Sequence, residues 1–268
     1  MLRKYSNHRT QGDNLKLGAL TALSAGMTNV VSVIVFFSYT SNITGHYAVF
    51  AQEVSRGNVY QAAVVLFWIL LFFSGSFLSN FVIIQGKDRI SSYLAHAIPI
   101  MLEFLGILAV GIYLQFFYTD TLLETEFLVG ILLFAMGLQN GLTASISNSV
   151  IKTTHLTGLT TDLAILVSMF TKRNNRSDEQ LVKKFHLLLV IMSCYVAGGI
   201  ISGVSYNFLG NATFFVVCFM LMFIALYDFY KLKRAKKVYD NRHDSLEENE
   251  LNYGTLQDKS KGRDKGND

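Results

Sequence analysis

The sequence predicts an all-α integral membrane protein with six transmembrane helices, built as a three-plus-three inverted repeat with two short broken or re-entrant helices. Three observations predict this class. Of the 268 residues, 51% are hydrophobic and only 16% are charged, whereas soluble proteins carry about 25% charged residues. Long apolar runs fill the chain between polar ends at 1–16 and 231–268. Two stretches within these runs carry nearly the same polar motif.

Six apolar segments are long enough to cross a membrane, since about 20 helical residues span about 30 Å of hydrocarbon. They are 17–38, 60–84, 94–118, 127–150, 184–206 and 211–230. Two further apolar pieces, 45–54 and 158–170, are too short to cross alone and are expected to form the short or re-entrant helices. A topology with eight crossings, or with one of these pieces crossing, stays open.

The repeated motif links the two halves of the chain. The first copy consists of Gly26–Asn29 and Asn42–Gly45, and the second of Gly137–Asn140 and Thr154–Gly158. Gly137 follows Gly26 by 111 positions, and the second Thr-Gly pair follows the first by 113. Each half contains three crossings, an odd number, so the second copy enters the membrane from the opposite face. This pattern is typical of the inverted repeats of solute transporters.

Lys and Arg residues in short flanking segments predict the orientation. They gather at the N-terminus, in 85–93, in 171–184 and after 230, whereas 119–126 carries acidic residues and no base. Both termini are therefore expected in the cytoplasm. The predicted division is a cytoplasmic segment 1–16, a first repeat 17–118, an external loop 119–126, a second repeat 127–230 and a basic, then disordered, cytoplasmic tail 231–268.

Three amide side chains fall inside predicted spans. Asn29 and Asn140 occupy matching positions of the repeat, and Gln139 lies beside the second. An amide in hydrocarbon needs hydrogen-bond partners, because leaving it unpaired costs several kcal/mol. Either these residues hold helices together, or they line a central polar site that binds a solute. Both interpretations stay open.

The two Thr-Gly pairs predict a second part of the same site. Thr44 and Gly45 follow Asn42, and Thr157 and Gly158 close the second motif. Glycine lets the backbone leave helical geometry, and threonine can cap the helix that follows. A helix that begins at membrane depth directs unpaired N–H groups and a positive dipole end inward. Such ends bind anionic groups in transporters; an ordinary turn at the membrane surface is the alternative.

Two acidic residues are candidates for coupling solute movement to a proton or cation. Asp162 lies four residues past Gly158 in the second short piece, and Glu103 lies about nine residues into the third span. An acidic side chain at membrane depth is a functional candidate. Asp162 could instead face the cytoplasm from a helix lying on the membrane surface, and Glu103 could pair with a neighbouring side chain.

The sequence shows no catalytic motif and predicts no cofactor and no metal site. Both cysteines, Cys194 and Cys218, lie within predicted spans with no metal-ligand spacing, and are expected to pack as small apolar residues. The expected partners are membrane lipids and an unknown small solute, without nucleic acid; a homo-oligomer is compatible with the sequence.

The two motifs carry a resemblance to a known family. The segment from Ala25 to Gly45 and the segments Met136–Asn140, Lys152–Gly158 and Thr161–Leu163 resemble the YoaK family of bacterial inner-membrane proteins, whose function is unknown. The resemblance covers about residues 15–230. It implies a six-span protein of the bacterial cell membrane and no particular substrate.

The leading functional hypothesis is a small membrane transporter, or a transport-like solute-binding protein, for an anionic or zwitterionic small solute. A non-transporting membrane scaffold or regulatory protein is the alternative, in which the polar residues only hold helices together. An intramembrane enzyme is a third, since acidic and histidine side chains from different spans could converge.

Overall fold

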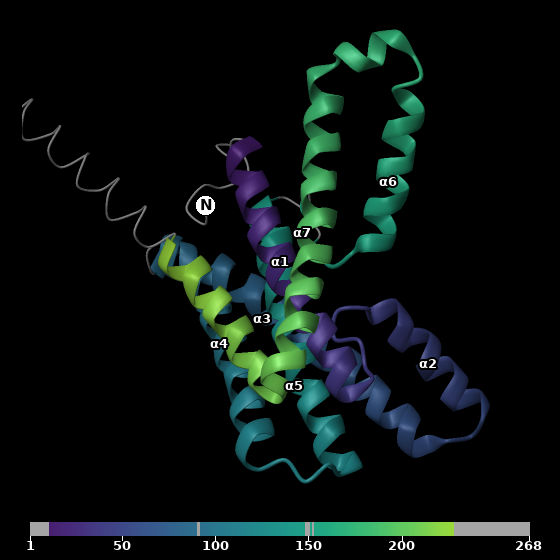
Figure 1. The fold of residues 1–268 in the computed structure, drawn as a ribbon, viewed down its shortest axis with the longest axis vertical. Helices are drawn as coiled ribbons and strands as arrows, with labels where there is room; N and C mark the ends of the chain where they lie inside the picture. The colour runs from purple at the N-terminus through teal and green to yellow at the C-terminus, as the bar shows by residue number, and fades with distance from the viewer. Residues whose placement is uncertain (1–10, 90–91, 148–150, 152, 228–268) are drawn as a thin grey trace, which may run out of the picture. The chain divides into compact units, whose positions relative to one another are not determined.

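The computed structural model of the protein describes residues 11–89, 92–147, 151 and 153–227, and the regular elements in these ranges are helices (Figure 1). The predicted tail 231–268 and residues 1–10 of the predicted N-terminal segment lie outside the described residues. Two compact units divide the chain at Ala225, and the elements described below belong to the first. They are α1 (Gln11–Phe36), α2 (Ile43–Ser55), α3 (Val59–Arg89), α4 (Ser92–Phe116), α5 (Leu122–Ser147), α6 (Leu156–Met169), η2 (Arg173–Ser177), α7 (Glu179–Leu209) and η3 (Gly210–Ala212), followed by a helix that begins at Thr213.

Five helical stretches are long and apolar enough to cross a membrane: 14–36, 59–86, 94–116, 122–147 and 179–227. The chain is therefore a multi-pass, all-helical protein of membrane type. The last stretch has 49 residues, which as one helix would extend about 74 Å, more than twice the hydrocarbon thickness. It is interrupted by η3, where Gly210 has a φ of 53°, so α7 and the helix from Thr213 are separate helices.

The two short helices predicted after the motifs are observed as α2 and α6. Each begins two residues before its predicted start. The long helices α3 and α7 exceed their predicted ranges of 60–84 and 184–206, because hydrophobicity marks only the apolar part of a helix. Charged turns such as 86–89 and 179–184 continue the same hydrogen-bonded backbone.

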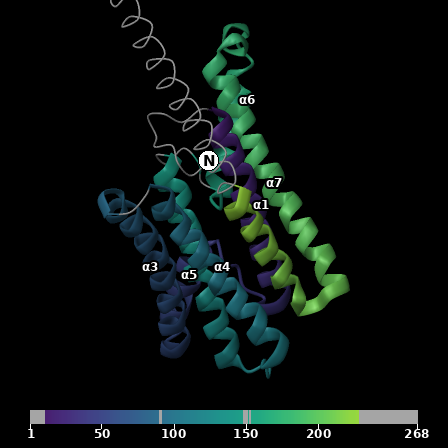
Figure 2. The same ribbon diagram turned by 90° about the vertical axis from the view of Figure 1, so that its left-hand side faces the viewer.

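Two close helix pairs form the centre of the fold. α1 packs along α7 and α3 packs along α5, while α2 lies beside α3 and α6 beside α7 (Figures 1 and 2). The backbones touch through glycines: a Cβ at Gly26 would overlap the Tyr195 carbonyl oxygen, and one at Gly198 would overlap that of Leu23.

The second pair has the same contacts. A Cβ at Gly137 would overlap the Phe72 carbonyl oxygen, and one at Gly75 would overlap that of Phe134. The two crossings share one geometry. Each glycine contacts a carbonyl group of the partner helix, and this carbonyl belongs to the residue three positions before the glycine of that helix. Small residues that let two backbones approach closely are typical of helix packing in membranes.

Candidate functional site

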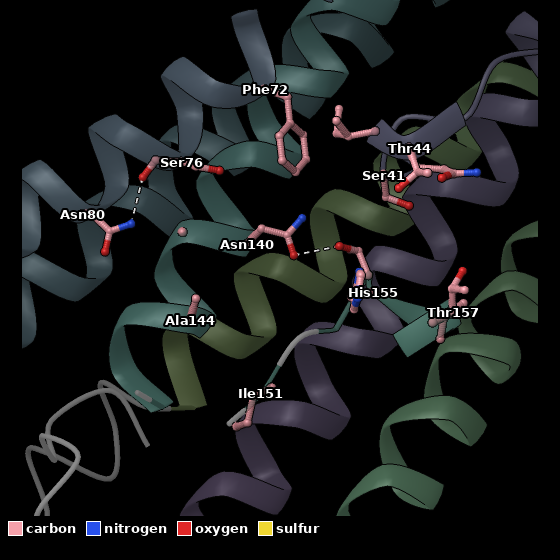
Figure 3. Close-up of a pocket in the computed structure, with 15 residues that line it drawn as sticks. Ser41, Thr44, Phe72, Ser76, Asn80, Asn140, Ala144, Ile151, His155 and Thr157 are labelled. Atoms are coloured by element: carbon pink, nitrogen blue, oxygen red, sulfur yellow. Dashed lines mark hydrogen bonds between the residues drawn. The ribbon is translucent and has the colours of Figure 1, made fainter. Parts of the chain in front are cut away.

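A pocket of about 410 Å³ lies where the N-terminal ends of α2 and α6 approach α3 and α5 (Figure 3). It is lined by Ser41, Asn42, Ile43, Thr44, Phe72, Ser76, Asn80, Asn140, Gly141, Ala144, Ile151, Thr154, His155, Leu156 and Thr157. Four residues predicted for the site are thereby brought together from both halves of the chain, namely Asn42, Thr44, Asn140 and Thr157.

The pocket exists because the chain folds back after α1 and after α5. Asn29 Oδ1 accepts hydrogen bonds from the backbone N–H groups of Thr40 (3.0 Å) and Ser41 (3.2 Å), and Asn140 Oδ1 accepts one from Thr154 Oγ1 (2.7 Å). Each asparagine lies seven residues before the end of its helix, about 10 Å along the axis. The segment after α1 and the segment after α5 therefore each fold back about 10 Å along the helix that they follow, and α2 and α6 begin at that depth.

The start of α2 is closed by a local cap. Asn42 is the N-cap residue, and its side-chain oxygen accepts a hydrogen bond from the Gly45 N–H (3.3 Å). The expectation that Thr44 caps this helix is wrong, because Thr44 already lies in its first turn. The reason is that the helix begins two residues earlier than Thr44 requires, directly after Asn42, and asparagine is a preferred N-cap residue.

The start of α6 has no side-chain cap, unlike the start of α2. His155 occupies the N-cap position and makes no side-chain capping hydrogen bond, so Thr157 is not the cap here either. A Cβ at Gly158 would overlap the imidazole ring of His155. Gly158 therefore gives the ring room to lie against the first turn of α6, where it lines the pocket.

The electrostatics of the pocket are set by helix ends and amides. Its described lining contains no Asp, Glu, Lys or Arg. The first turns of α2 and α6 each contribute roughly half a positive charge. In addition, the amide nitrogen of Asn140 is buried and has no hydrogen-bond partner among the described residues. The described lining thus presents donors and a positive field without a Lys or Arg side chain.

Asn29 has the same place in the motif but different surroundings. The Tyr195 hydroxyl is hydrogen-bonded to the side chains of Asn29 and Ser41, and Asn29 is not among the described residues that line the pocket. The expectation that Asn29 and Asn140 share one cavity is therefore wrong. The corresponding place beside Asn140 is taken by Phe72, whose ring carries no hydroxyl.

Gln139 lies at the contact of α1 and α5 and not in the pocket lining. It is 1% exposed, and its Nε2 donates to the carbonyl oxygen of Thr21 (3.1 Å) and to the Ser24 hydroxyl. This geometry is that of a residue holding two helices together. Gly45 and Gly158 also lie outside the lining, one residue further into their helices than the lining threonines.

The two coupling candidates lie apart from the pocket. Asp162 on α6 pairs with Lys184 on α7 (3.3 Å), and its side chain is 47% exposed. Glu103 on α4 is 1% exposed, and its Oε1 has no hydrogen-bond partner among the described residues. A role of either residue in coupling stays a prediction.

Sequence reasoning missed the contribution of α3. Ser76 and Asn80 line the pocket, although neither was predicted as a site residue. Ser76 Oγ donates to the Gly137 carbonyl oxygen (2.9 Å), and Asn80 Nδ2 donates to that of Ser76 (3.0 Å). Their four-residue spacing on an apolar helix is the signal that could have assigned them.

Comparison with known proteins gives one match. Residues 17–227 match the model of a family described as "protein of unknown function (DUF1275)". No curated protein and no solved structure matches the chain.

Proposed function

The chain belongs to the DUF1275 family of proteins of unknown function, and on that premise we propose its function from its own pocket. The protein is a small membrane transporter, or a transport-like solute-binding protein, for a small anionic or zwitterionic solute. The observation that carries this proposal is the convergence of two helix N-termini, one from each half of the chain, on a single polar pocket.

We also propose the three-plus-three inverted repeat, with six crossings. Three lines of geometry support it. The helices α1, α2 and α3 have 26, 13 and 31 residues, and α5, α6 and α7 have 26, 14 and 31. The glycine contacts of the α1–α7 crossing recur in the α5–α3 crossing. Finally, equivalent asparagines tie down the connections that lead into α2 and α6.

The membrane placement follows from charge. Basic segments flank one side of the spans and acidic residues the other, which supports a cytoplasmic position for both termini. The bacterial inner membrane is the location that the resemblance to the YoaK family implies. Membership of the YoaK family is part of the same proposal. So is the division of the chain into segments that end at residues 16, 118, 126 and 230.

The proposed contacts of the solute are the first turns of α2 and α6, with Asn42, Thr44 and Thr157, and the free amide N–H group of Asn140. Four further residues contribute indirectly, because they hold the helices and connections of the site in place: Asn29, Gln139, Gly45 and Gly158. For proton or cation coupling, Glu103 is the preferred candidate because it is buried on a predicted span, whereas Asp162 already has a basic partner.

A non-transporting scaffold is the second candidate, and the structure offers one observation in its favour. Asn29 and Gln139 hydrogen-bond to neighbouring chain segments, as residues do that only hold helices together. The scaffold does not explain why the buried Asn140 amide nitrogen has no partner among the described residues while Asn140 lines a pocket.

The test is thermal unfolding of the purified protein against a panel of small metabolites. A solute present at about 100 times its Kd stabilises the native state by about 2.7 kcal/mol, which raises the unfolding midpoint by about 5 °C or more. In Asn140→Asp the acceptor for Thr154 remains but a carboxylate faces the solute, and the response to anions should disappear.

Asn29→Asp is the matched control, because it places the same change at the equivalent position outside the pocket and keeps an oxygen that accepts the hydrogen bonds from Thr40 and Ser41. Its response to the solute should match that of the wild type, whatever its basal stability. No stabilisation by any panel member, or an equal loss in both variants, would reject the pocket as a solute site.

A further inference from the structure

A second pocket lies at the turn between α6 and α7, and it differs in chemistry from the first. Its volume is about 490 Å³. Its apolar wall is formed by Val167 and Phe170 at the end of α6 and by Val182 and Phe185 at the start of α7. The rings of Phe170 and Phe185 pack edge to face, with centroids 5.5 Å apart. Arg176 of η2 also lines the pocket.

The turn holds Arg176 at this pocket by a defined contact. Arg176 Nε donates to the carbonyl oxygen of Phe170 (2.7 Å), and Asn175 Nδ2 donates to that of Met169 (2.9 Å). These two bonds satisfy carbonyl groups at the C-terminal end of α6. The rest of the guanidinium group carries further N–H donors that can bind an oxyanion.

The charge around the pocket is strongly basic. Residues 172–184 contain five basic and two acidic side chains. Asp178 caps α7 through the N–H groups of Gln180 and Leu181, Glu179 pairs with Lys183, and Asp162 of α6 pairs with Lys184. The surplus of positive charge at the turn therefore comes from Lys172, Arg173 and Arg176. The turn therefore attracts anions.

The length of α7 indicates where this pocket lies in a membrane. Its 31 residues extend about 46 Å, about 16 Å more than the hydrocarbon layer. The segment after 186 is apolar and long enough to cross, so the excess falls at the N-terminal turns, beside the pocket. An apolar wall next to a basic turn at headgroup depth matches an anionic phospholipid, with its phosphate at Arg176 and its glycerol and chains on the apolar wall.

We propose that this pocket, formed by the turn from α6 to α7, is a binding site for an anionic phospholipid. It is separate from the solute pocket and does not depend on transport.

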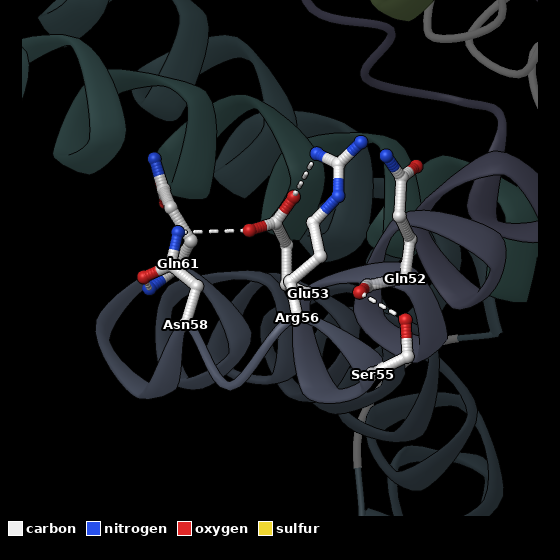
Figure 4. A network of polar contacts seen from close by, with 6 residues as sticks. All are labelled: Gln52, Glu53, Ser55, Arg56, Asn58 and Gln61. Atoms are coloured by element: carbon white, nitrogen blue, oxygen red, sulfur yellow. Dashed lines mark hydrogen bonds and ion pairs between the residues drawn. The ribbon is translucent and has the colours of Figure 1, made fainter.

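The corresponding turn between α2 and α3 serves as the internal comparison (Figure 4). There Arg56 pairs with Glu53 (3.6 Å), and Asn58 Nδ2 donates to the same carboxylate (2.8 Å). The charges of Arg56 and Glu53 balance each other at this turn. Arg56→Gln therefore removes an arginine from the corresponding turn of the other half and leaves the pocket beside Arg176 unchanged.

The experiment compares phosphatidylglycerol with phosphatidylcholine of the same acyl chains, added to the purified protein in detergent. The unfolding midpoint of the wild type and of Arg56→Gln should rise by about 3 °C or more in phosphatidylglycerol over phosphatidylcholine. In Arg176→Gln the difference between the two lipids should fall to less than half, and Arg176→Lys, which keeps the charge, should retain most of it.

Three results would overturn the proposal. The first is equal stabilisation by the two lipids. The second is an Arg176→Gln variant whose midpoint falls equally in both lipids, which indicates a purely structural arginine. The third is the full effect from soluble glycerol phosphate, which identifies a free phosphate as the occupant. The first two results do not bear on the solute pocket. Because glycerol phosphate is itself a small anion that the solute pocket could bind, its effect is assigned to the turn from α6 to α7 only where Arg176→Gln abolishes it.

Discussion

Asn29 and Asn140 illustrate at the scale of single residues how a repeat can give two identical side chains different tasks. Both accept hydrogen bonds from the chain segment that follows their own helix. Tyr195 adds a hydroxyl partner to Asn29, and Phe72, 123 positions earlier in the corresponding place, adds none to Asn140. The difference between the two sites is therefore the presence of the Tyr195 hydroxyl beside Asn29 and the lack of a hydroxyl on Phe72 beside Asn140.

This difference predicts the effect of Phe72→Tyr. The new hydroxyl would lie beside Asn140, as the Tyr195 hydroxyl lies beside Asn29, and a solute would have to displace it. We expect the affinity for the solute found in the panel experiment to fall about tenfold or more, equivalent to about 1.4 kcal/mol. The measurement is a titration of the unfolding midpoint with solute.

Phe73→Tyr is the control for that change, because Phe73 is the next residue of α3 and is 65% exposed. Its affinity for the solute should equal that of the wild type. If Phe72→Tyr binds as tightly as the wild type, the ring of Phe72 does not border the solute.

The sequence predicted the helices that form this site better than it predicted the roles of single residues in it. The short helices were predictable because apolar pieces of 10 and 13 residues follow glycine-containing motifs. The roles of Asn29 and Asn140 were not, because their local sequences are alike and the deciding residue lies on another helix. The ion pair of Asp162 was not predictable for the same reason, since its partner Lys184 is 22 residues away and reaches it only when α6 packs on α7.

At the scale of elements, the stability of the fold rests on two close backbone crossings. The glycines of the α1–α7 and α5–α3 pairs have no room for a methyl group, because a main-chain carbonyl occupies the place of a Cβ. A backbone carbonyl cannot rotate away as a side chain can, so the helices themselves would have to separate.

Gly26→Ala and Gly137→Ala should therefore both destabilise the protein, by about 1–3 kcal/mol each. The unfolding midpoint should fall by about 2 °C or more in either variant. Gly106→Ala is the control: a Cβ there would lie 3.6 Å from its nearest neighbour, the Ala135 Cβ, and should leave the midpoint unchanged or raise it. A wild-type midpoint in Gly26→Ala or Gly137→Ala would contradict the crossing geometry.

At the scale of the whole molecule, the inverted repeat makes a prediction about sidedness. In a background without Cys194 and Cys218, single cysteines at 119–126 and 207–210 should react with a membrane-impermeant thiol reagent added outside intact cells. Cysteines at 85–93 and 172–183 should react only after the membrane is opened. Labelling of 172–183 from outside would contradict the inverted arrangement, because the two halves would then not enter from opposite faces.

The central claim is that two helix N-termini make one pocket attractive to anions, and it can be tested before any solute is known. The measurement is the ratio of the reaction rates of an anionic and a cationic methanethiosulfonate of similar size at Thr157→Cys, in the same cysteine-free background. Ser55→Cys at the exposed end of α2 is the reference. Two helix N-termini contribute about 0.6–2 kcal/mol together, so the ratio at position 157 should exceed the reference ratio by about threefold to thirtyfold. A ratio at position 157 equal to or below the reference would contradict the claim.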